Sequence, residues 1–321
     1  MKRVALLTLA ALVSLLVLAA PSAAAKAAKW TVPGDFATIQ EAIDDPDVVD
    51  GDRIFVGPGS FAGALVDKSV EIKGIGGATI DDGPVHGSGL IQGFRLLAGS
   101  DGATISHLTF TTDLSIMNGA AVDDVTVTQC TFLDSIQAIS NWRGNGWEIS
   151  HNSIMDLRTR CGGGIGIMVA DFSGGTVVDN VVSHNKIYGT LHVSEGDCGG
   201  YNGSGIVLFA DFRWEALGAD SITGNRVVKN KVSLVSDTPA VVDVVALELT
   251  EHGDIAAGWP VDPPDPPVIC SNAIGFNDWR GTTIQVDYTP DNLESCNDIS
   301  RNLGNNRGHG LHPSVFGPGG N

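Results

Sequence analysis

The sequence predicts an all-β protein that folds as a right-handed parallel β-helix, a solenoid of stacked coils with a short N-terminal capping helix. Glycine accounts for 41 of the 321 residues, nearly twice its average share, which disfavours a helical bundle. Short runs of β-branched and apolar residues recur with one shape along most of the chain. A small or amide residue occupies the same place in each run, which is typical of coils that stack at tight turns.

The first 25 residues have the three parts of a secretory signal. Lys2 and Arg3 precede an apolar run over 4–20, and a small-residue stretch ends at Ala25. The alternative is a membrane anchor, but an apolar run of about 17 residues is at the short limit for spanning a bilayer. We therefore expect cleavage before Lys26, no membrane span afterwards, and a protein that is secreted, periplasmic or held at the cell surface.

We expect residues 26–321 to form a single parallel β-helix domain. The N-terminal cap occupies 26–50, the coils with their inserted loops occupy 51–303, and an irregular tail occupies 304–321. Asp35 is a good N-cap for a short helix, which is placed to close the N-terminal end of the solenoid core.

The repeat is visible as a column of equivalent positions. Leu108, Cys130 and Asn152 follow one another in steps of 22 residues. Asparagine tolerates left-handed turn conformations, and stacked asparagine side chains can bond each other as a ladder. The later copies of the column are Asn180, Asn185, Asn225, Asn230, Asn272 and Asn302.

A second repeat has an offset of 40 residues and contains an acidic residue at the same place each time. It aligns Asp171 with Asp211 and Glu251. The alternation of side chains along a strand predicts which of them face the core. The predicted inward pairs are Ile167 with Val169, Val207 with Phe209 and Leu247 with Leu249, and the predicted outward residues are Met168, Leu208 and Glu248.

Five cysteines remain after cleavage, and an oxidising compartment favours pairing of an even number of them. Cys130 lies in a strand-like run, so it is the expected buried free thiol. Cys161 with Cys198, and Cys270 with Cys296, would then form the disulfides that close loops, although four cysteines allow three pairings.

The chain is strongly acidic, with 37 acidic and 19 basic residues and a formal net charge of −18. Removal of the signal, with its two basic residues, leaves a net charge of −20. A nucleic-acid binder must neutralise phosphates with lysine and arginine, so nucleic acid is excluded as a class of partner. The same excess of acid argues against direct capture of an anionic polysaccharide unless Ca²⁺ mediates it.

The start of the mature chain resembles a known superfamily. Similarity to the opening of pectin lyase-like right-handed parallel β-helix proteins is carried by Trp30-Thr-Val-Pro-Gly-Asp-Phe-Ala-Thr-Ile-Gln-Glu-Ala-Ile43, Gly51-Asp-Arg-Ile-Phe-Val-Gly-Pro-Gly-Ser-Phe61 and Val70-Glu-Ile-Lys-Gly-Ile75. Pectinesterases and periplasmic β-helix proteins of the copper-maturation type begin this way. With the asparagine repeats, the resemblance covers nearly all of the mature chain and implies the fold. The superfamily holds lyases, hydrolases, esterases, epimerases, adhesins and proteins that are not enzymes, so it implies no single activity.

The catalytic motifs of two member families are not reproduced. A polygalacturonase-like site needs Asn-Thr-Asp, a paired Asp, Gly-His-Gly and then Arg-Ile-Lys, whereas Gly308-His309-Gly310 lies near the C-terminus with no Arg-Ile-Lys after it. A pectinesterase-like site needs an Asp beside Phe-Ile-Phe-Gly and a later Arg-x-Trp, which Ala170-Asp171-Phe172 echoes only faintly. The resemblance therefore assigns no catalytic residue to this chain.

A carboxylate column is the candidate metal site. Pectate lyases hold Ca²⁺ in a carboxylate cluster on one face of the β-helix, and the column of Asp171, Asp211 and Glu251 is similar in kind. Stacked carboxylates repel unless a cation lies between them, and oxygen ligands suit Ca²⁺, the one cofactor predicted. Asp211 is also a candidate catalytic residue. The alternative is three solvated acids in turns.

A Trp-Arg-Gly sequence occurs in two predicted loops, at 142–144 and 279–281. An indole stacks on sugar rings and a guanidinium binds a carboxylate through two hydrogen bonds. The candidate substrate-binding residues are Trp142, Arg143, Trp279 and Arg280, with Arg158 and Arg160 beside them. Arg143 and Arg280 are also candidate catalytic bases for a lyase. The alternative is that each Trp covers an end of the core while its Arg stays in water.

Polar residues precede the repeat column and form a row of their own. Its predicted members are His107, Gln129, His151, His184, Lys229, Ser271 and Arg301. This mixture of side chains indicates an outward polar row rather than a histidine metal site. The function predicted from the whole sequence is binding of an extracellular polysaccharide, with a polysaccharide lyase or glycoside hydrolase reaction as its enzymatic form. The alternative is a non-enzymatic structural or adhesive solenoid at a cell surface or in a matrix.

Overall fold

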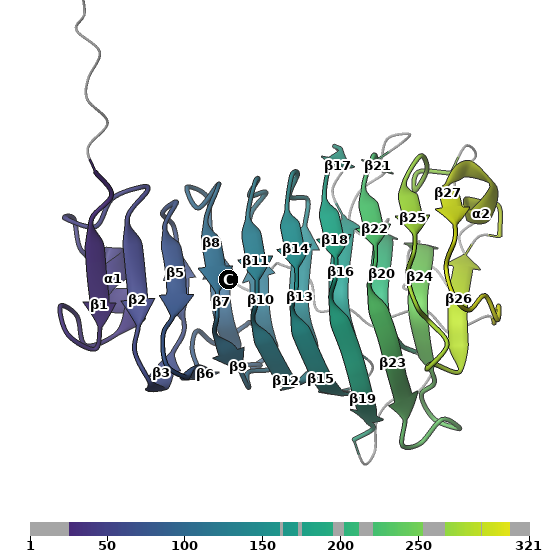
Figure 1. The fold of residues 1–321 in the computed structure, drawn as a ribbon, viewed down its shortest axis with the longest axis horizontal. Helices are drawn as coiled ribbons and strands as arrows, with labels where there is room; N and C mark the ends of the chain where they lie inside the picture. The colour runs from purple at the N-terminus through teal and green to yellow at the C-terminus, as the bar shows by residue number, and fades with distance from the viewer. Residues whose placement is uncertain are drawn as a thin grey trace, which may run out of the picture.

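The strands of the molecule form a stack of coils. The computed structural model describes residues 26–160, 163–172, 175–194, 202–211, 221–252, 267–289 and 291–308. Each strand pairs with the equivalent strands of the coils before and after it, as Figure 1 shows from the purple to the yellow end. The pairings between these strands are parallel, which confirms the predicted right-handed parallel β-helix.

Three sheets run along the solenoid. Sheet A contains β1 (Lys29–Val32), β2 (Arg53–Val56), β5 (Glu71–Gly74), β8 (Thr104–Ser106), β11 (Thr126–Thr128), β14 (Glu148–Ser150), β18 (Val181–Ser183), β22 (Arg226–Val228), β25 (Ala273–Gly275) and β27 (Asp298–Ser300). Sheet B contains β3 (Gly59–Ala62), β6 (Ala78–Asp82), β9 (Thr109–Phe110), β12 (Thr131–Ser135), β15 (Ser153–Arg158), β19 (Lys186–His192) and β23 (Lys231–Ser236). Sheet C contains β4 (Ala64–Val66), β7 (Gln92–Leu96), β10 (Leu114–Asn118), β13 (Gln137–Trp142), β16 (Ile165–Asp171), β20 (Gly203–Asp211), β24 (Val244–His252) and β26 (Ile284–Thr289). A fourth, small sheet pairs β17 (Val177–Val178) with β21 (Ile222–Thr223).

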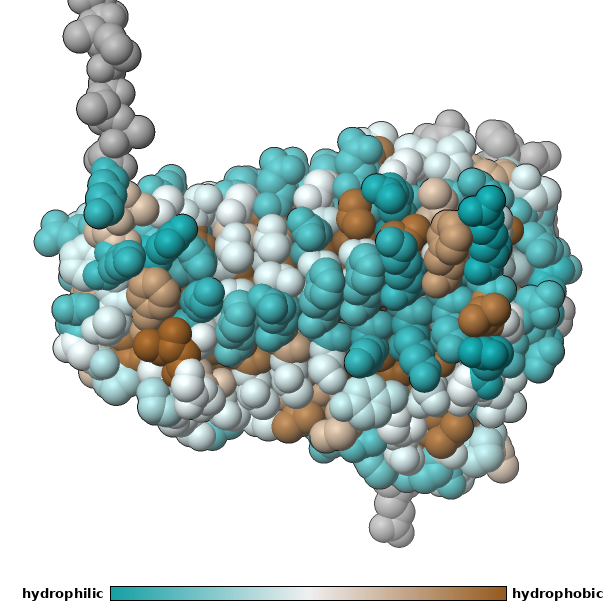
Figure 2. Space-filling view, in the orientation of Figure 1, coloured by the Kyte–Doolittle hydropathy of each residue, from teal (hydrophilic) through white to brown (hydrophobic). Residues whose placement is uncertain are grey.

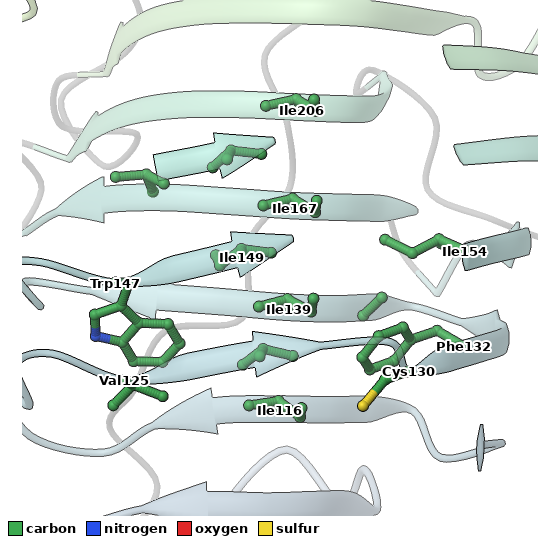
Figure 3. Packing of buried hydrophobic residues seen from close by; sticks show 14 of the residues in the cluster. Ile116, Val125, Cys130, Phe132, Ile139, Trp147, Ile149, Ile154, Ile167 and Ile206 are labelled. Atoms are coloured by element: carbon green, nitrogen blue, oxygen red, sulfur yellow. The ribbon is translucent and has the colours of Figure 1, made fainter. Parts of the chain in front are cut away.

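The core fills the space between the three sheets. Equivalent inward-facing residues of successive coils stack along the axis, and Figure 3 shows this row on sheet C for Ile116, Ile139, Ile167 and Ile206. The rings of Phe110 and Phe132 stack in the same way, 5.0 Å apart between centroids. Cys130 is buried among them as a free thiol, as predicted, and burial raises the pKa of its thiol to about 12.

The asparagine column is confirmed as a hydrogen-bonded stack, but it consists of two ladders. One ladder contains Asn152, Asn185, Asn230, Asn277 and Asn302, and the other contains Asn180, Asn225, Asn272 and Asn297. In each ladder the side-chain Nδ2 donates to the Oδ1 of the next asparagine. The ladders lie five residues apart because the later coils turn sharply twice, once before and once after the strand of sheet A.

The short N-terminal helix is present as α1 (Ile39–Asp44). It begins later than predicted, because Thr38 rather than Asp35 is its N-cap. The Thr38 side chain accepts from the Glu41 N–H, and the Glu41 carboxylate accepts from the backbone N–H of Thr38. Ile39 and Ile43 of this helix are buried in the core, as expected of a cap. A second helix, α2 (Leu293–Cys296), lies near the other end.

No helix in the described part of the chain is long and apolar enough to cross a membrane. The predicted signal, residues 1–25, lies outside the described residues, as does most of the predicted tail, from residue 309 onward. The division of the chain into signal, cap, coils and tail therefore stays a prediction.

Candidate functional site

The predicted carboxylate column does not form, because the strand register differs from the 40-residue offset. β16 pairs with β20 at an offset of 39 residues, and β20 pairs with β24 at an offset of 41. Asp171 is therefore in register with Ala210 and then Glu251, while Asp211 is paired with residue 252. The described residues contain no group of three histidine, cysteine or acidic side chains placed to hold a metal ion. The residues do not fit the predicted Ca²⁺ cluster.

The same register corrects the predicted orientation of β20. Ile206 and Leu208 face the core, and Val207 and Phe209 belong to a second apolar cluster on the outer side of sheet C. The sequence does not decide between the two orientations because the central residues of β20, Ile206 to Ala210, are all apolar, so no alternation with polar residues marks the core face. The predicted inward positions of β16 and β24 are correct.

Glu251 acts within the fold. Its Oε1 accepts from the backbone N–H groups of Val268 and Ile269, at 2.7 and 3.0 Å, where the chain enters the next coil. Burial raises the pKa of this carboxyl. Glu251 is thus an anchor for backbone donors rather than one of three stacked metal ligands or a solvated turn acid.

Both tryptophans of the repeated sequence are buried, Trp142 to 1% and Trp279 to 0% exposure. Neither indole offers a face to a sugar ring. Trp279 packs in the main core and Arg280 stays exposed, as the alternative prediction has it, whereas Trp142 belongs to the second apolar cluster in the middle of sheet C and does not cover an end of the core. The Arg280 side chain stays 62% exposed and donates two bonds to Asp278. The Arg143 guanidinium lies 5.7 Å from the centre of the Phe172 ring. The two arginines are thus held by their own neighbours, and the structure does not bring them together with the tryptophans in one site.

The remaining sequence candidates have separate outcomes. Arg158 forms salt bridges with Asp113 and Asp134 of preceding coils, so it clamps coils together. Arg160 is exposed. The Cys270–Cys296 disulfide is confirmed, whereas Cys161 and Cys198 lie outside the described residues and their pairing stays a prediction.

A hollow on the outer face of sheet B is the candidate site that emerges from the structure. It has a volume of about 450 Å³ and crosses β15, β19 and β23. Its lining residues are Ser153, Lys186, Tyr188, Lys231 and Ser233, and we call it the lysine groove. None of the sequence candidates for substrate binding lines it.

Strand register places the two lysines of the groove. Ser153, Lys186 and Lys231 occupy equivalent positions on three successive strands of sheet B. Because parallel strands lie about 4.8 Å apart, the two lysines leave the sheet one coil apart. Both lysines are exposed, and neither ammonium group forms a salt bridge with a described residue. The chain as a whole has a formal net charge of −18, so this pair is a local concentration of positive charge on an acidic protein.

Tyr188 gives the groove an aromatic wall. It is 39% exposed and lies two residues after Lys186 on the same face of β19. Its hydroxyl lies 3.3 Å from the Ser153 hydroxyl of the preceding coil. Its neighbour in the following coil is Ser233, which is much smaller than a tyrosine. The groove therefore combines two cations, an aromatic ring and two hydroxyl groups from serine.

A polar row borders the groove at the turn from sheet A to sheet B. Its members share left-handed backbone angles. Six are polar or charged, namely His107, Gln129, His151, His184, Lys229 and Arg301, and the seventh is the exposed Phe276. Phe276 occupies the place predicted for Ser271, which belongs to the neighbouring turn. Figure 2 shows hydrophilic residues crossing this face of the molecule along the solenoid. The His151 and His184 rings stack 4.8 Å apart, and desolvation, followed by the charges of His151 and Lys229, lowers the pKa of His184.

Buried carboxyl groups mark the outer side of sheet C. Glu248 and Asp287 are in register on β24 and β26, and both are buried. Glu248 accepts from the Ser204 hydroxyl at 2.5 Å and from the Asn202 amide at 2.7 Å. Burial, with a further contribution from the charge of Asp287, raises the pKa of Glu248 to about 8. This pair lies on a different sheet from the lysine groove.

Comparison with known proteins gives one local match and one match of fold. No family model matches the chain. A cell surface glycoprotein of Methanothermus fervidus is 37% identical over 83 residues, which are 23% of this chain and 14% of that protein, so the match spans about a seventh of the relative. An alginate lyase from Paenibacillus sp. str. FPU-7 aligns over 89% of this chain and 99% of its own, at 15% identity and a TM-score of 0.45. At that likeness the alginate lyase supports no conclusion about the site.

Proposed function

We propose that this protein works outside the cell and binds an acidic polysaccharide in the lysine groove. The observation that carries the proposal is the pair of exposed lysines, Lys186 and Lys231, one coil apart beside the ring of Tyr188. The coil spacing of about 4.8 Å is close to the length of one sugar ring. A polyuronate chain that lies along the solenoid axis therefore passes about one sugar residue over each coil, within reach of the two lysines.

The charge distribution supports this choice of surface. A polyanion is repelled by a strongly acidic protein unless a local patch of cations attracts it. Lys186, Lys231 and the bordering Lys229 supply such a patch from the chain itself. The proposal consequently needs no bound Ca²⁺, and calcium binding stays a separate prediction.

Location and cleavage are further parts of the proposal. The relative named as a cell surface glycoprotein supports a position at the cell surface, where a polysaccharide-binding solenoid serves in adhesion. Cleavage by β-elimination or hydrolysis stays a prediction. Incubating the protein with each bound polysaccharide and measuring unsaturated products and new reducing ends tests both reactions.

The direct test of the groove is removal of its two lysines. We expect Lys186→Ala with Lys231→Ala to weaken binding of polygalacturonate about tenfold at low salt, because each exposed ion pair contributes up to about 1 kcal/mol. Isothermal titration at two salt concentrations measures this, and the loss should shrink as salt screens the charges.

The matched control removes the same charge elsewhere. Lys29→Ala with Lys73→Ala deletes two lysines of sheet A near the other end of the solenoid and should leave binding unchanged. Equal weakening by both double variants, or no binding of polygalacturonate or a sulfated glycan by the unaltered protein, contradicts the proposal. Binding of a neutral glucan with equal affinity contradicts it as well.

Binding should also tighten as the pH falls from about 7 to about 5, the range in which histidine protonates. His184 is two residues before Lys186, and its pKa is lowered in the free protein, so it is neutral at pH 7. A bound polyanion favours the protonated imidazole of His184, so binding takes up protons. Titration of the variant His184→Asn should give a flatter pH profile, since asparagine also tolerates the left-handed backbone of this site. A profile as steep as that of the unaltered protein would show that other groups take up the protons.

A further inference from the structure

The shape of the lysine groove depends on one small residue, Ser233. Along the outer face of sheet B, Met155, Tyr188 and Ser233 occupy equivalent positions of three successive coils. Aromatic rings in equivalent positions stack at coil spacing elsewhere in this molecule, as Phe110 and Phe132 do. At Ser233 no ring follows Tyr188, so the space that a third large side chain would fill is open and forms part of the groove.

The position of Tyr188 widens that space. Its hydroxyl lies 3.3 Å from Ser153 in the preceding coil, so the side chain leans away from Ser233. On the other side the next coil approaches closely, because a Cβ added to Gly281 would come within 2.1 Å of the Ser233 hydroxyl. The space above Ser233 is thus a slot, with the Tyr188 ring as one wall and the backbone at Gly281 as the opposite end.

Charge marks only one edge of the slot. Lys186 and Lys231 lie two residues before Tyr188 and Ser233 on their strands, so both ammonium groups stand along the same edge. Asp278 follows Lys231 in the next coil, and the pKa of its carboxyl is lowered by hydrogen bonds from Arg280, then by the charge of Arg280 and last by that of Lys231. The carboxylate of Asp278 therefore lies beside Lys231, in the coil that follows the two lysines.

We infer that the space above Ser233 is a subsite for one uronosyl ring, which lies against Tyr188 with its carboxylate directed to Lys186 and Lys231. This inference rests on the proposed function and names the unit that the groove recognises. A sugar ring presents C–H groups to an aromatic face, a carboxylate to cations and hydroxyl groups to serine hydroxyls. A polyanion without such a ring satisfies only the lysines.

Filling the slot without changing charge tests the inference. Ser233→Tyr should weaken binding of a galacturonate oligosaccharide about tenfold, because the ring is excluded, and should leave the weaker, charge-driven binding of polyglutamate unchanged. Thr131→Tyr is the matched control, since it adds the same side chain to the outer face of sheet B two coils before β19. Thermal unfolding establishes that both variants remain folded.

A second variant covers the case in which Ser233→Tyr disturbs the neighbouring coil at Gly281. Tyr188→Leu keeps an apolar side chain of ordinary size but removes the aromatic wall, and we expect several-fold weaker binding of the oligosaccharide with unchanged binding of polyglutamate. Oligosaccharide binding that Tyr188→Leu and Ser233→Tyr leave intact overturns the subsite. The lysine variants test the proposed function separately, because they should weaken binding of both polyanions.

Discussion

Replacing Asn230 with alanine should destabilise the protein by about 3 to 5 kcal/mol, because one side chain serves several buried groups. Its Oδ1 accepts from the backbone N–H and the side-chain Nδ2 of Asn185, both at 3.0 Å. Its Nδ2 donates to the Val182 carbonyl at 2.9 Å and to Oδ1 of Asn277 at 3.0 Å. Alanine leaves these groups without partners in a site that water does not reach. Equilibrium unfolding in denaturant measures the change.

The end of the same ladder provides the control. Asn302 accepts from Asn277 and donates to the Ile274 carbonyl, but it is only partly buried, so water can replace part of what Asn302→Ala removes. We expect a loss of about 1 kcal/mol for this variant. Similar losses of stability for both variants would mean that a buried ladder asparagine contributes no more to stability than the partly buried one at the end of the ladder.

The asparagines illustrate how far the sequence predicts this fold. A repeated residue at a turn identifies a solenoid, because stacking places equivalent positions in contact. The pattern does not reveal that Asn225 and Asn230 belong to different ladders, since both follow the same kind of apolar run. That assignment depends on which turn each residue occupies, and two turns five residues apart have the same local sequence preference.

The carboxylate column illustrates where the sequence misleads. Matching Ala170-Asp171-Phe172 to the identical tripeptide that contains Asp211 gives an offset of 40 residues, but the register offsets are 39 and 41. The loops between strands can differ in length by a single residue. An identical tripeptide in two coils of unequal length therefore does not show that its residues are in register. Buried strands such as β20 add no polar alternation that would reveal the error.

The lysine groove was absent from the sequence predictions although a signal for it exists. Lys186 and Lys231 each follow a ladder asparagine directly, and Tyr188 and Ser233 lie two residues further on. Once Asn185 and Asn230 are assigned to one ladder, these positions are adjacent in space. The prediction of a site at the two Trp-Arg pairs is wrong because large aromatic residues in a solenoid also fill the ends and sides of the core.

Replacing Glu248 with glutamine should make the protein more stable at pH 8 and change its stability little at pH 4.5. Burial raises the pKa of Glu248 from its ordinary 4.5 to about 8, so the folded state holds a proton that the unfolded state releases across this range. The contribution of this group to stability is therefore complete below pH 4.5 and falls as the pH rises towards 8, at up to about 1.4 kcal/mol per pH unit. Summed over that window, the loss is of the order of 4 kcal/mol, and glutamine does not incur it.

Denaturant unfolding of both proteins at several pH values measures the effect. Glutamine keeps an oxygen to accept from Ser204 and Asn202 and offers an amide towards Asp287, so the buried contacts survive the change. The control Glu148→Gln makes the same substitution at an exposed glutamate of sheet A, and so separates the effect of burial from that of the substitution itself. A difference for Glu248→Gln that does not grow with pH would contradict a protonated Glu248. Growth between pH 4.5 and 8 would establish that sheet C holds a neutral carboxylic acid at neutral pH, beside the carboxyl group of Asp287.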